Sequence, residues 1–382
     1  MRKKTVKDIK NLKGAKVLLT ADFNISLING HVTNDTRIVE TLPTIDYLTK
    51  KGAKVIIVSH LGRPKGFDAR LSLKPVQKRL EKLLGKRIFF LNKFPDKKNS
   101  EKIKRIHDGE IILMENIRFH QGEEENDPVF SKELASLADC FVNDAFGTAH
   151  RVHASIVGIA EYIKGYAGFL MAKEIEMISH AIENPKKPFL IIIGGAKTPE
   201  KISVIERIMN IADTVALGGA IANTFLAAWG FGMGRSLVDY EMVEMARVVF
   251  WQATRKHSAL ILPNDVVYSD KERKLRPHTT EYNKVPHHAV IYDIGIKTRT
   301  TYHKLIKEAG TIIWNGPMGL YEDPRFSKGT KDVLRDIAES NAFTIIGGGD
   351  TLTSIENKKY LKKINHISTG GSAMLAFMEK GT

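Results

Sequence analysis

Hydrophobic residues recur along the chain in short runs rich in Val, Ile and Leu, each followed by glycine or polar residues and then by a longer amphipathic segment. Several runs are apolar on both alternating faces, as strands covered by helices on both sides are. Strands that alternate with helical segments predict parallel sheets built from right-handed crossover units. The predicted strands are AKVLLT, AKVIIVSH, RIFFL, EIILM and DCFVNDA in the first half, and PFLIIIGG, DTVALGG, ALILP, HAVIYDIG, GTIIWNG and FTIIGGG in the second.

This number of strands is large for one open sheet, and a chain of 382 residues is long for one domain. The segment 168–188 separates the two groups of strands. Its apolar residues Leu170, Ile175, Ile178 and Ile182 recur at helical spacing, and Asn184-Pro185 ends the helix. We therefore expect an α/β fold of two doubly wound, Rossmann-like parallel-sheet domains joined by an interdomain helix and hinge.

Three predicted strand ends in the second half carry glycines and lead directly into helices: IIIGGAKTPEK, VALGGAIANTF and TIIGGGDTLTS. Glycine lets a backbone approach a phosphate closely, and a helix N-terminus offers free N–H groups. Parallel sheets bind ligands at their carboxyl edge, so three such turns indicate a ligand crevice. For any one turn, a purely structural role in a tight connection is an open alternative.

Charged residues stand beside these turns. Lys197 and Lys201 are one helical turn apart, so both ammonium groups can face the same anion. Asp350 follows three glycines, where a carboxylate can hold Mg²⁺ on a nucleotide or, alternatively, cap a helix. Glu322 follows the turn WNGPMGLYE and is a candidate for binding ribose hydroxyls.

A different set of polar residues follows the predicted strands of the first half. Arginine binds carboxylate and phosphate oxygens with two parallel hydrogen bonds, and repeated placement at strand ends brings several guanidinium groups to one edge of a sheet. The pattern predicts an anion site there. The candidates are Asp22, Asn24, Arg37, His60, Arg63, Arg118 and Arg151.

Net charge supports an anionic partner in the first half. The chain has 58 Lys and Arg against 43 Asp and Glu, a formal charge of +15; residues 1–100 hold 23 basic and 8 acidic groups, and the rest hold 35 of each. Such a field favours nucleic acid, an acidic membrane or a small phosphorylated substrate. The single cysteine, Cys140, excludes an internal disulfide, and no run has the length of a membrane span, so we expect a reducing, cytoplasmic setting.

The motifs resemble those of the phosphoglycerate kinase family, in the family's order and over nearly the full chain. They are DFN at 22–24, DTR at 35–37, SHLGRPKG at 59–66, ENIRFH at 115–120, NDAFGTAHR at 143–151, GFLMAKE at 168–174, GGAK with Lys201, ANTFL at 222–226, WNGPMG at 314–319, GGGDT at 347–351 and STGG at 368–371.

The resemblance implies reversible transfer of the acyl phosphate of 1,3-bisphosphoglycerate to Mg-ADP in glycolysis, giving 3-phosphoglycerate and Mg-ATP, by a cytoplasmic, hinge-bending monomer. It implies a phosphoglycerate-binding domain over 1–167, an interdomain helix over 168–184 and a nucleotide-binding domain over 185–365. The segment 366–382 is expected to return toward the N-terminal domain. Transfer is expected to be direct and in line, without a covalent enzyme intermediate.

The resemblance also implies roles for individual residues. Mg²⁺ would bind Asp350. The catalytic set would be Arg37, Lys197, Lys201, Gly348 and Gly371. The substrate contacts would be Asp22, Phe23, Asn24, Arg37, His60, Leu61, Gly62, Arg63, Arg118 and Arg151. The nucleotide contacts would be Gly195, Lys197, Lys201, Gly219, Ile291, Asn315, Pro317, Glu322, Gly348, Gly349, Asp350 and Thr351.

Several positions depart from the family's pattern. Thr20 stands where an arginine is usual, Ile291 where glycine is usual and Ile296 where proline is usual; Ala220 and Ser372 each replace a glycine. We expect neutral drift at Ala220 and Ser372, because their side chains are small. At Ile291, drift and an altered nucleotide affinity are both open.

Two rival interpretations follow from the charge and from these departures. A nucleic-acid-binding protein would interleave basic residues with aromatics for stacking, whereas the lysine-rich stretches 2–16 and 74–98 contain only Phe89, Phe90 and Phe94. A catalytically weakened relative is the second rival, but every matched arginine and Lys201 is present. We therefore expect an active enzyme that uses neither nucleic acid nor a membrane as its partner.

Overall fold

The computed structural model describes residues 3–92, 97–196, 198–253, 255, 258–355 and 358–381. The chain divides into two compact units, Met1–Glu176 and Met177–Thr382. The division falls inside helix α5 (Phe169–Glu183), which occupies the segment expected to be the interdomain helix. The expected functional boundaries of the two domains stay a prediction.

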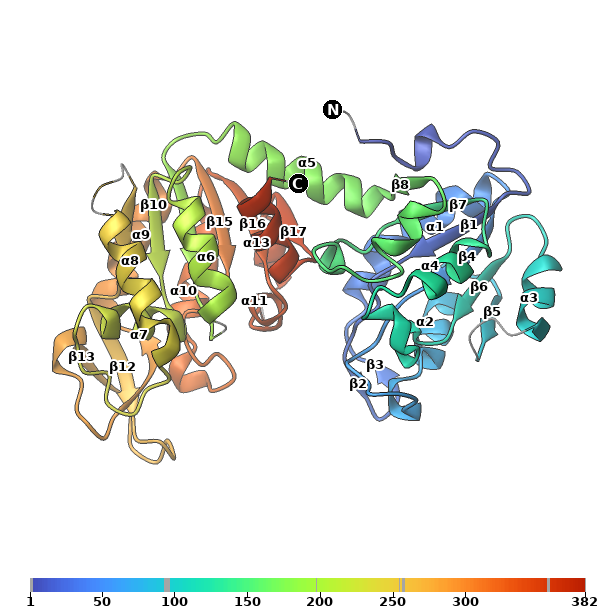
Figure 1. Ribbon diagram of the computed structural model, residues 1–382. Helices are drawn as coiled ribbons and strands as arrows, with labels where there is room; N and C mark the ends of the chain where they lie inside the picture. Colours follow the sequence, from blue (N-terminus) through green and yellow to red (C-terminus); the bar gives the residue numbers. More distant parts are fainter. Residues whose placement is uncertain are drawn as a thin grey trace. The chain divides into compact units, whose positions relative to one another are not determined.

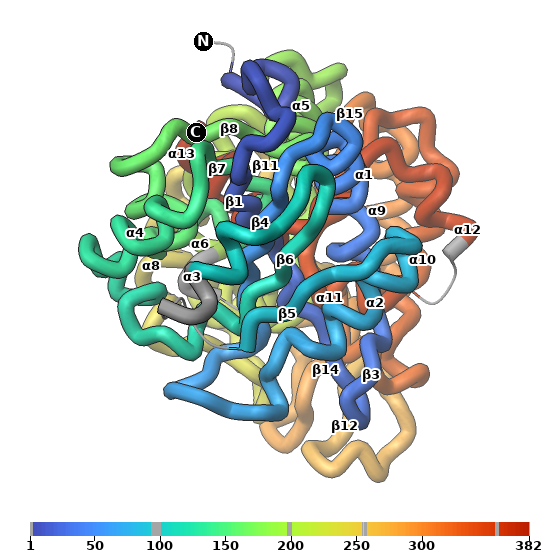
Figure 2. Tube along the Cα trace, turned by 90° about the vertical axis from the view of Figure 1, so that its right-hand side faces the viewer, coloured from blue at the N-terminus to red at the C-terminus, as the bar shows by residue number. Residues whose placement is uncertain are grey.

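The first unit contains a six-stranded parallel sheet with the order β5-β6-β4-β1-β7-β8. Figure 2 shows β7, β1, β4, β6 and β5 following one another in that order. The central strand β1 is buried along its length after Lys16, because it pairs with β4 on one side and β7 on the other. The strands are β1 (Lys16–Thr20), β4 (Lys54–Val58), β5 (Ile88–Leu91), β6 (Ile111–Met114), β7 (Cys140–Asn143) and β8 (Gly165–Ala167).

Helices cover both faces of this sheet, as the doubly apolar strands predict (Figure 1). Val17 and Leu19 of β1 pack in one core cluster with Ile45 of α1, whereas Leu18, between them, packs in a second cluster with Phe130 of α4. Cys140 is buried in the first cluster, as expected. The helices are α1 (Thr36–Lys50), α2 (Lys74–Leu84), α3 (Lys97–Lys104) and α4 (Pro128–Ala135), and a hairpin joins β2 (Leu27–Ile28) to β3 (His31–Val32).

The second unit repeats this design with a parallel sheet in the order β11-β10-β9-β15-β16-β17. Every residue of β9 and β15 is buried, because both strands are central and covered on both faces. The strands are β9 (Phe189–Ile193), β10 (Thr214–Leu217), β11 (Ala259–Ile261), β15 (Thr311–Asn315), β16 (Phe343–Gly347) and β17 (His366–Ser368).

The helices of the second unit include α13, which packs against α6. The expected return of residues 366–382 toward the first unit stays a prediction. The helices are α6 (Thr198–Ile208), α7 (Gly219–Ala228), α8 (Val243–Ala253), α9 (Ile296–Glu308), α10 (Lys328–Glu339), α11 (Gly349–Thr353), α12 (Lys358–Leu361) and α13 (Gly371–Lys380).

One predicted strand belongs to a different sheet from the one expected. The run HAVIYDIG forms β14 (Val290–Ile294), but β14 pairs antiparallel with β12 (Asp265–Ser269), which in turn pairs with β13 (His278–Glu281). The connection from β13 to β14 contains only the short 3-10 turn Tyr282–Lys284. Both β13 and β14 run antiparallel to β12, one on each side of it, so the three strands form a small sheet separate from the six-stranded parallel sheet.

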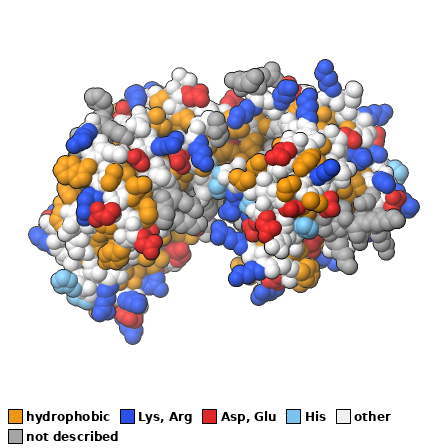
Figure 3. Space-filling model, viewed as in Figure 1, with side chains coloured by type: hydrophobic (Ala, Val, Ile, Leu, Met, Phe, Trp, Pro, Cys, Tyr) orange, Lys and Arg blue, Asp and Glu red, His pale blue; other side chains and the backbone are white. Residues whose placement is uncertain are grey.

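Lys and Arg side chains do not form one continuous patch on the face that Figure 3 shows. There, Lys and Arg side chains are spread among neutral and acidic ones. Lys74, Lys78 and Lys82 of α2, for example, are exposed to solvent. Within the described residues, no helix is long and apolar enough to cross a membrane.

Candidate active site

The predicted anion site of the first unit lies at the carboxyl ends of neighbouring strands. Asp22 follows β1, His60 follows β4 and Arg118 follows β6 in the 3-10 turn η3 (Ile117–Phe119). Arg151 lies after β7, beyond the 3-10 turn η5 (Phe146–Thr148). Because β6, β4, β1 and β7 are adjacent in the sheet, their parallel arrangement brings these four side chains to one edge.

Hydrogen bonds connect the loops at this edge. Arg37, at the start of α1, donates to the carboxylate of Asp22. The side-chain oxygen of Asn24 accepts from the backbone N of Gly62 at 2.9 Å, and Nη1 of Arg118 donates to the carbonyl of Gly62 at 2.7 Å. Asn24 and Arg118, from two different loops, are thereby both attached to Gly62 in a third loop.

His60 lies at the centre of the charged groups. Burial lowers its pKa to about 3; the nearby charge of Asp22 opposes this shift, and the charges of Arg118, Arg37 and Arg151 reinforce it. The imidazole is therefore neutral at pH 7. Since each of these charges acts on His60, the structure gathers the three arginines and Asp22 around one side chain.

Two arginines of the cluster have buried nitrogens that bind nothing in the described chain. Nη2 of Arg118 and Nε of Arg151 have no hydrogen-bond partner there. Burial lowers the pKa of Arg118, with further lowering by the charges of Arg151 and Arg63. Buried donors without partners are rare in proteins, and here they indicate a site prepared for an anion.

Asp22 balances part of this positive charge. Burial alone would raise its pKa, but the charge of Arg37 and the hydrogen bonds from Arg37 and from the backbone N of Asn24 hold the pKa below its ordinary value. The other predicted contacts, Phe23, Leu61 and Arg63, lie in the same loops; Phe23 and Leu61 are buried, and Arg63 is exposed.

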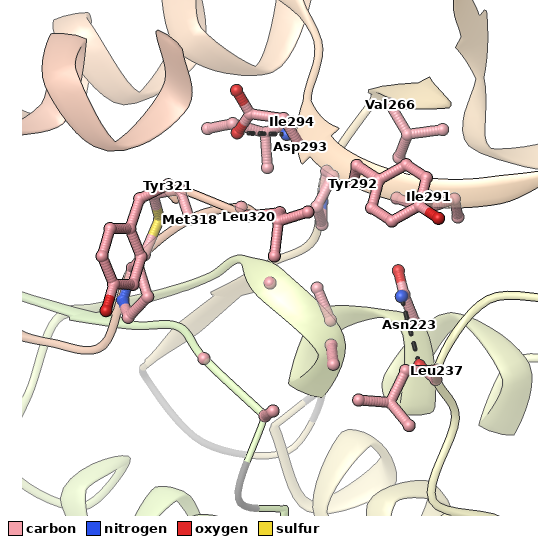
Figure 4. A pocket seen from close by; sticks show the side chains of 18 of the residues that line it. Asn223, Leu237, Val266, Ile291, Tyr292, Asp293, Ile294, Met318, Leu320 and Tyr321 are labelled. Atoms are coloured by element: carbon pink, nitrogen blue, oxygen red, sulfur yellow. Dashed lines mark hydrogen bonds between the residues drawn. The ribbon is translucent and has the colours of Figure 1, made fainter. Parts of the chain in front are cut away.

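The second unit contains a pocket of about 340 Å³ at the carboxyl edge of its sheet. Figure 4 shows Tyr321 at one end of the pocket and Leu237 and Ile291 at the other. Glu322 and Asp350 also line the pocket, and both lie near Tyr321, since burial together with their charges raises the pKa of Tyr321 to about 12. The pocket therefore has an acidic end and an apolar end.

Glycines allow the loops around this pocket to approach one another. Gly195, Gly219, Gly316 and Gly348 have positive φ angles, which side chains rarely adopt. A Cβ at Gly371 would lie 2.8 Å from Cα of Gly348, and a Cβ at Gly219 would lie 2.6 Å from the backbone N of Gly195. Backbone, rather than side chains, forms much of this site.

Several predicted nucleotide contacts hold these turns together. Asn315 donates from Nδ2 to the carbonyl of Gly371 at 3.3 Å, and Thr351 Oγ1 accepts from the backbone N of Gly316 at 2.7 Å. Lys201 is buried and donates to the carbonyl of Gly194. Gly195 donates to the carbonyl of Pro317 at 2.8 Å. Lys197 lies outside the described residues.

The alternative role of Asp350 as a helix cap is wrong, because Gly348 occupies the N-cap position of α11. Asp350 is exposed within the first turn of that helix. Among the described residues, no cluster of three or more His, Cys, Asp or Glu side chains forms a preassembled metal site.

A sequence model of one family, described as phosphoglycerate kinase, matches residues 6–381. The chain belongs to the phosphoglycerate kinase family. It is 48% identical over 383 residues to phosphoglycerate kinase of Dictyoglomus turgidum, covering 99% of this chain and 97% of the relative. It is 46% identical over 385 residues to phosphoglycerate kinase of Thermosipho africanus, covering 99% and 96%.

Solved structures of the family are also similar. Phosphoglycerate kinase from Coxiella burnetii gives a TM-score of 0.84 at 39% identity, covering 98% of this chain and 96% of that one. The enzyme from Pyrococcus horikoshii gives 0.85 at 32% identity, covering 98% and 95%. Family membership confirms the two-domain α/β fold and a glycolytic phosphotransferase activity with a carboxyl group as acceptor.

The positions that depart from the family's pattern have distinct surroundings. Thr20 is buried and donates through Oγ1 to the carbonyl of Ser155 at 2.8 Å. Ala220 and Ile291 line the pocket. Ile296 is 62% exposed at the first position of α9, and Ser372 lies in the first turn of α13.

Sequence reasoning missed side chains that support the predicted contacts. Nδ2 of Asn116 donates to the carbonyls of Leu61 at 2.7 Å and Leu71 at 2.9 Å, and so shapes the loop after His60. Its position directly after a strand could have suggested such a role. Glu123 is buried although its acidic surroundings are typical of a surface loop, and the sequence carries no signal of this burial.

Proposed function

We propose that this chain transfers the acyl phosphate of 1,3-bisphosphoglycerate directly to Mg-ADP, reversibly, with phosphoglycerate held by the first unit and the nucleotide by the second. The observation that carries the proposal is the gathering of Arg37, Arg118 and Arg151 around a neutral His60. A compact substrate with several negative charges suits this cluster better than a single carboxylate does.

In the first unit, the 3-phosphate would bind His60, Arg63, Arg118 and Arg151. The unpartnered nitrogens of Arg118 and Arg151 supply donors that need no rearrangement. Asp22 and Asn24, with the neighbouring backbone, would bind the hydroxyl and carboxyl region of the glycerate. Arg37, which bonds to Asp22, would reach the transferring phosphoryl group and orient the acyl oxygen.

In the second unit, the base would occupy the apolar end of the pocket, near Leu237 and Ile291, because the acidic end and the glycine turns suit the polar parts of a nucleotide. Glu322 would bind the ribose hydroxyls. The backbone N–H groups around Gly348–Thr351 and Gly370–Ser372 would face the phosphates, and Lys201 with Lys197 would follow the transferred group.

Mg²⁺ would bind Asp350. The exposed carboxylate at the acidic end of the pocket fits this ion, which usually takes one or two protein carboxylates and completes its shell with substrate phosphates and water. When bound, Mg²⁺ neutralises phosphate charge that would otherwise repel the incoming group.

The transition state of phosphoryl transfer is loose and spreads negative charge over the equatorial oxygens, so the protein mainly aligns and stabilises. With donors divided between two units, hinge closure would complete the set and exclude water that would hydrolyse the acyl phosphate. We infer no covalent intermediate; isolation of a phosphorylated His60 or His150 during turnover would contradict this inference.

We further propose a cytoplasmic monomer whose partners are these substrates, without nucleic acid or a membrane. The spread of basic side chains on the face in Figure 3 supports the absence of a continuous nucleic-acid stripe. The presence of all predicted arginines at one sheet edge favours an active enzyme over a catalytically weakened relative.

A coupled assay of ATP formation from 1,3-bisphosphoglycerate, ADP and Mg²⁺ tests the proposal, with Arg37→Ala as the comparison. We expect the wild-type protein to form ATP and the Arg37→Ala variant to have almost no activity. A correctly folded wild-type protein that forms no ATP would instead favour the weakened relative.

A further inference from the structure

A buried carboxylate of the first unit, Glu123, has no part in the proposed phosphoryl transfer although it lies beside the arginine cluster. Glu123 ends the 3-10 turn η4 (Gln121–Glu123) and is 2% exposed. Both of its oxygens bind one residue: Oε2 accepts from the backbone N of Ser155 at 3.0 Å, and Oε1 accepts from Ser155 Oγ at 2.6 Å. Nδ1 of His153 lies 3.7 Å from Oε1. The carboxylate therefore holds the segment 153–155 in place.

The same segment is attached at two further points. The backbone N of Ala154 donates to the carbonyl of Glu123 at 3.0 Å. Thr20, at the end of β1, donates to the carbonyl of Ser155 at 2.8 Å. Residues 153–155 are thus fixed between the central strand of the sheet and η4.

This attachment joins the two loops that carry the arginines with unpartnered nitrogens. The segment 153–155 continues the loop of Arg151, and η4 follows directly after η3, which carries Arg118. Besides burial, the charge of Arg151 lowers the pKa of Arg118, so the two guanidinium groups lie close enough to repel each other. The charge of Glu123 acts on Arg118 in the opposite direction. Other contacts must therefore hold the guanidinium groups of Arg118 and Arg151 close together against their repulsion, so that both can bind one anion.

We propose that Glu123 is a positioning residue of the substrate site, which fixes the loop of Arg151 at the separation from Arg118 that a phosphate group requires. The proposal rests on the proposed function for the identity of that phosphate. Beside the carboxylate is a cavity of about 10 Å³, lined in part by Thr20, His60, Glu123, His153 and Ser155. A space of this size holds about one water molecule.

Glu123→Gln tests the proposal with almost no change of volume. The amide oxygen can still accept from the backbone N of Ser155, but the bond with Ser155 Oγ must reverse, with the amide nitrogen as donor, and both bonds lose the carboxylate charge that strengthens them. We expect the KM for 3-phosphoglycerate to rise about tenfold, while kcat and the KM for ATP stay within about twofold. Ser155→Ala removes only the bond from Oγ and should raise the KM for 3-phosphoglycerate about threefold. The KM of the double variant should be little higher than that of Glu123→Gln, because both changes weaken the same interaction.

The second unit offers a matched control. Asp265 is also 2% exposed and also binds a hydroxyl residue, since Oδ1 accepts from both the backbone N and Oγ1 of Thr298 at 2.8 Å; its Oδ2 accepts from the backbone N of Lys297 at 3.0 Å. Asp265→Asn makes the same chemical change without touching the arginine loops. We expect it to lower the melting temperature as Glu123→Gln does and to leave the KM for 3-phosphoglycerate unchanged. An unchanged KM in folded Glu123→Gln, or an equal rise in both variants, would overturn the proposal.

Binding of inorganic phosphate, measured by titration calorimetry, separates this proposal from the proposed function. If the wild-type protein binds phosphate but forms no ATP, the proposed function fails; a selective loss of phosphate affinity of about tenfold in Glu123→Gln would still support the positioning role. Equal phosphate affinity in wild type and Glu123→Gln would refute that role. If Glu123→Gln does not fold, Ser155→Ala decides by the same measurement, and an unchanged affinity in that variant overturns the proposal.

Discussion

The two ligand sites of this chain use different materials for the same purpose, which is to surround negative charge. In the first unit, charged side chains from three loops and from the start of α1 gather at a sheet edge around His60. In the second unit, glycine turns bring backbone N–H groups to a sheet edge, and Gly371 and Gly348 nearly touch. Both sites lie at the carboxyl edge of a parallel sheet, because the strands of such a sheet all end on the same side.

The difference determines how each site can be damaged. A side-chain site loses function when a charge is removed, since the fold has no second donor at that position. A backbone site loses function when a Cβ is added, because no side chain was contributing the hydrogen bonds. Changes at single residues of each site test this difference, beginning with the change of largest expected effect.

Removing Arg37 tests the side-chain site most strongly. We expect Arg37→Ala to lower kcat about 10²- to 10³-fold, the usual cost of losing one donor to a charged transition state. A coupled assay at saturating substrate measures kcat. Arg70→Ala is the matched control, since Arg70 has an 88% exposed side chain and pairs only with Asp68 among the described residues. A loss below about tenfold in Arg37→Ala would remove Arg37 from the catalytic set.

Adding one methyl group tests the backbone site. In Gly371→Ala, the new Cβ would lie 2.8 Å from Cα of Gly348, and neither turn can relieve this contact by rotating a side chain. We expect the KM for ADP to rise about tenfold or more and the KM for phosphoglycerate to stay unchanged. Gly232→Ala is the control, because no atom lies within 4 Å of its added Cβ. Equal kinetics in the two variants would show that the close approach of the turns is unimportant.

A buried carboxyl group with a pKa of about 7 lies in each unit, which extends the comparison to stability. Burial raises the pKa of both Asp144 and Asp293. A raised pKa in the folded state means that the folded protein keeps its proton when the unfolded chain has lost it. Each group therefore contributes stability that is present below about pH 4 and is lost as the pH rises toward 7.

Asp144→Asn should remove this loss in the first unit. Oδ1 of Asp144 accepts from the backbone N of Met171 at 3.0 Å, whereas Oδ2 has no hydrogen-bond partner in the described chain, so an amide nitrogen fits at Oδ2. Calorimetry measures the difference in melting temperature between the variant and the wild type. We expect this difference to be about 3 °C more favourable to the variant at pH 7 than at pH 4.

Asp293→Asn is the comparison from the second unit. There, Oδ1 accepts from Ile294 and Oδ2 from Gly329, so an amide loses one acceptor and should be less stable than wild type at pH 4. A pH-independent difference between wild type and Asp144→Asn would contradict the assignment of a raised pKa to Asp144.

Replacing Ile291 should have the smallest effect of the four. It tests whether this side chain, which is unusual for the family, affects nucleotide affinity. Ile291 lines the apolar end of the pocket, so Ile291→Gly should raise the KM for ADP about threefold by removing apolar contact and leave that for phosphoglycerate unchanged. Ile296→Gly is the control, since Ile296 is another departure from the family and is 62% exposed outside the pocket. Equal changes in both KM values for Ile291→Gly would refute a role in nucleotide affinity.

The sequence predicted much of the fold because burial on two faces leaves a readable pattern. The runs around β1, β4, β9 and β15 each contain at least three consecutive apolar residues, and all four are central strands. Weaker signals failed: β8 and β17 are short edge strands that were not predicted, and β14 was assigned to the wrong sheet. Periodicity reports burial, whereas the choice of pairing partner and its direction depends on residues distant in sequence.

The candidate site followed the same division. Strand-end positions predicted Asp22, His60, Arg118 and Arg151 together, since parallel topology makes strand ends neighbours. What surrounds them was not predictable: the burial of Glu123, its grip on Ser155, and the part that Thr20 takes in holding the same segment. These contacts join residues more than thirty positions apart.

By itself, the sequence determined the chemical inventory and its order: which strands are buried, which loops carry arginine and which turns carry glycine. The tertiary structure decided which of these groups face each other, and so which donors are left without partners and which carboxylates become buried. The physical reason is that hydrophobic patterning acts locally along a strand or helix, whereas desolvation and charge interaction depend on every neighbour in space.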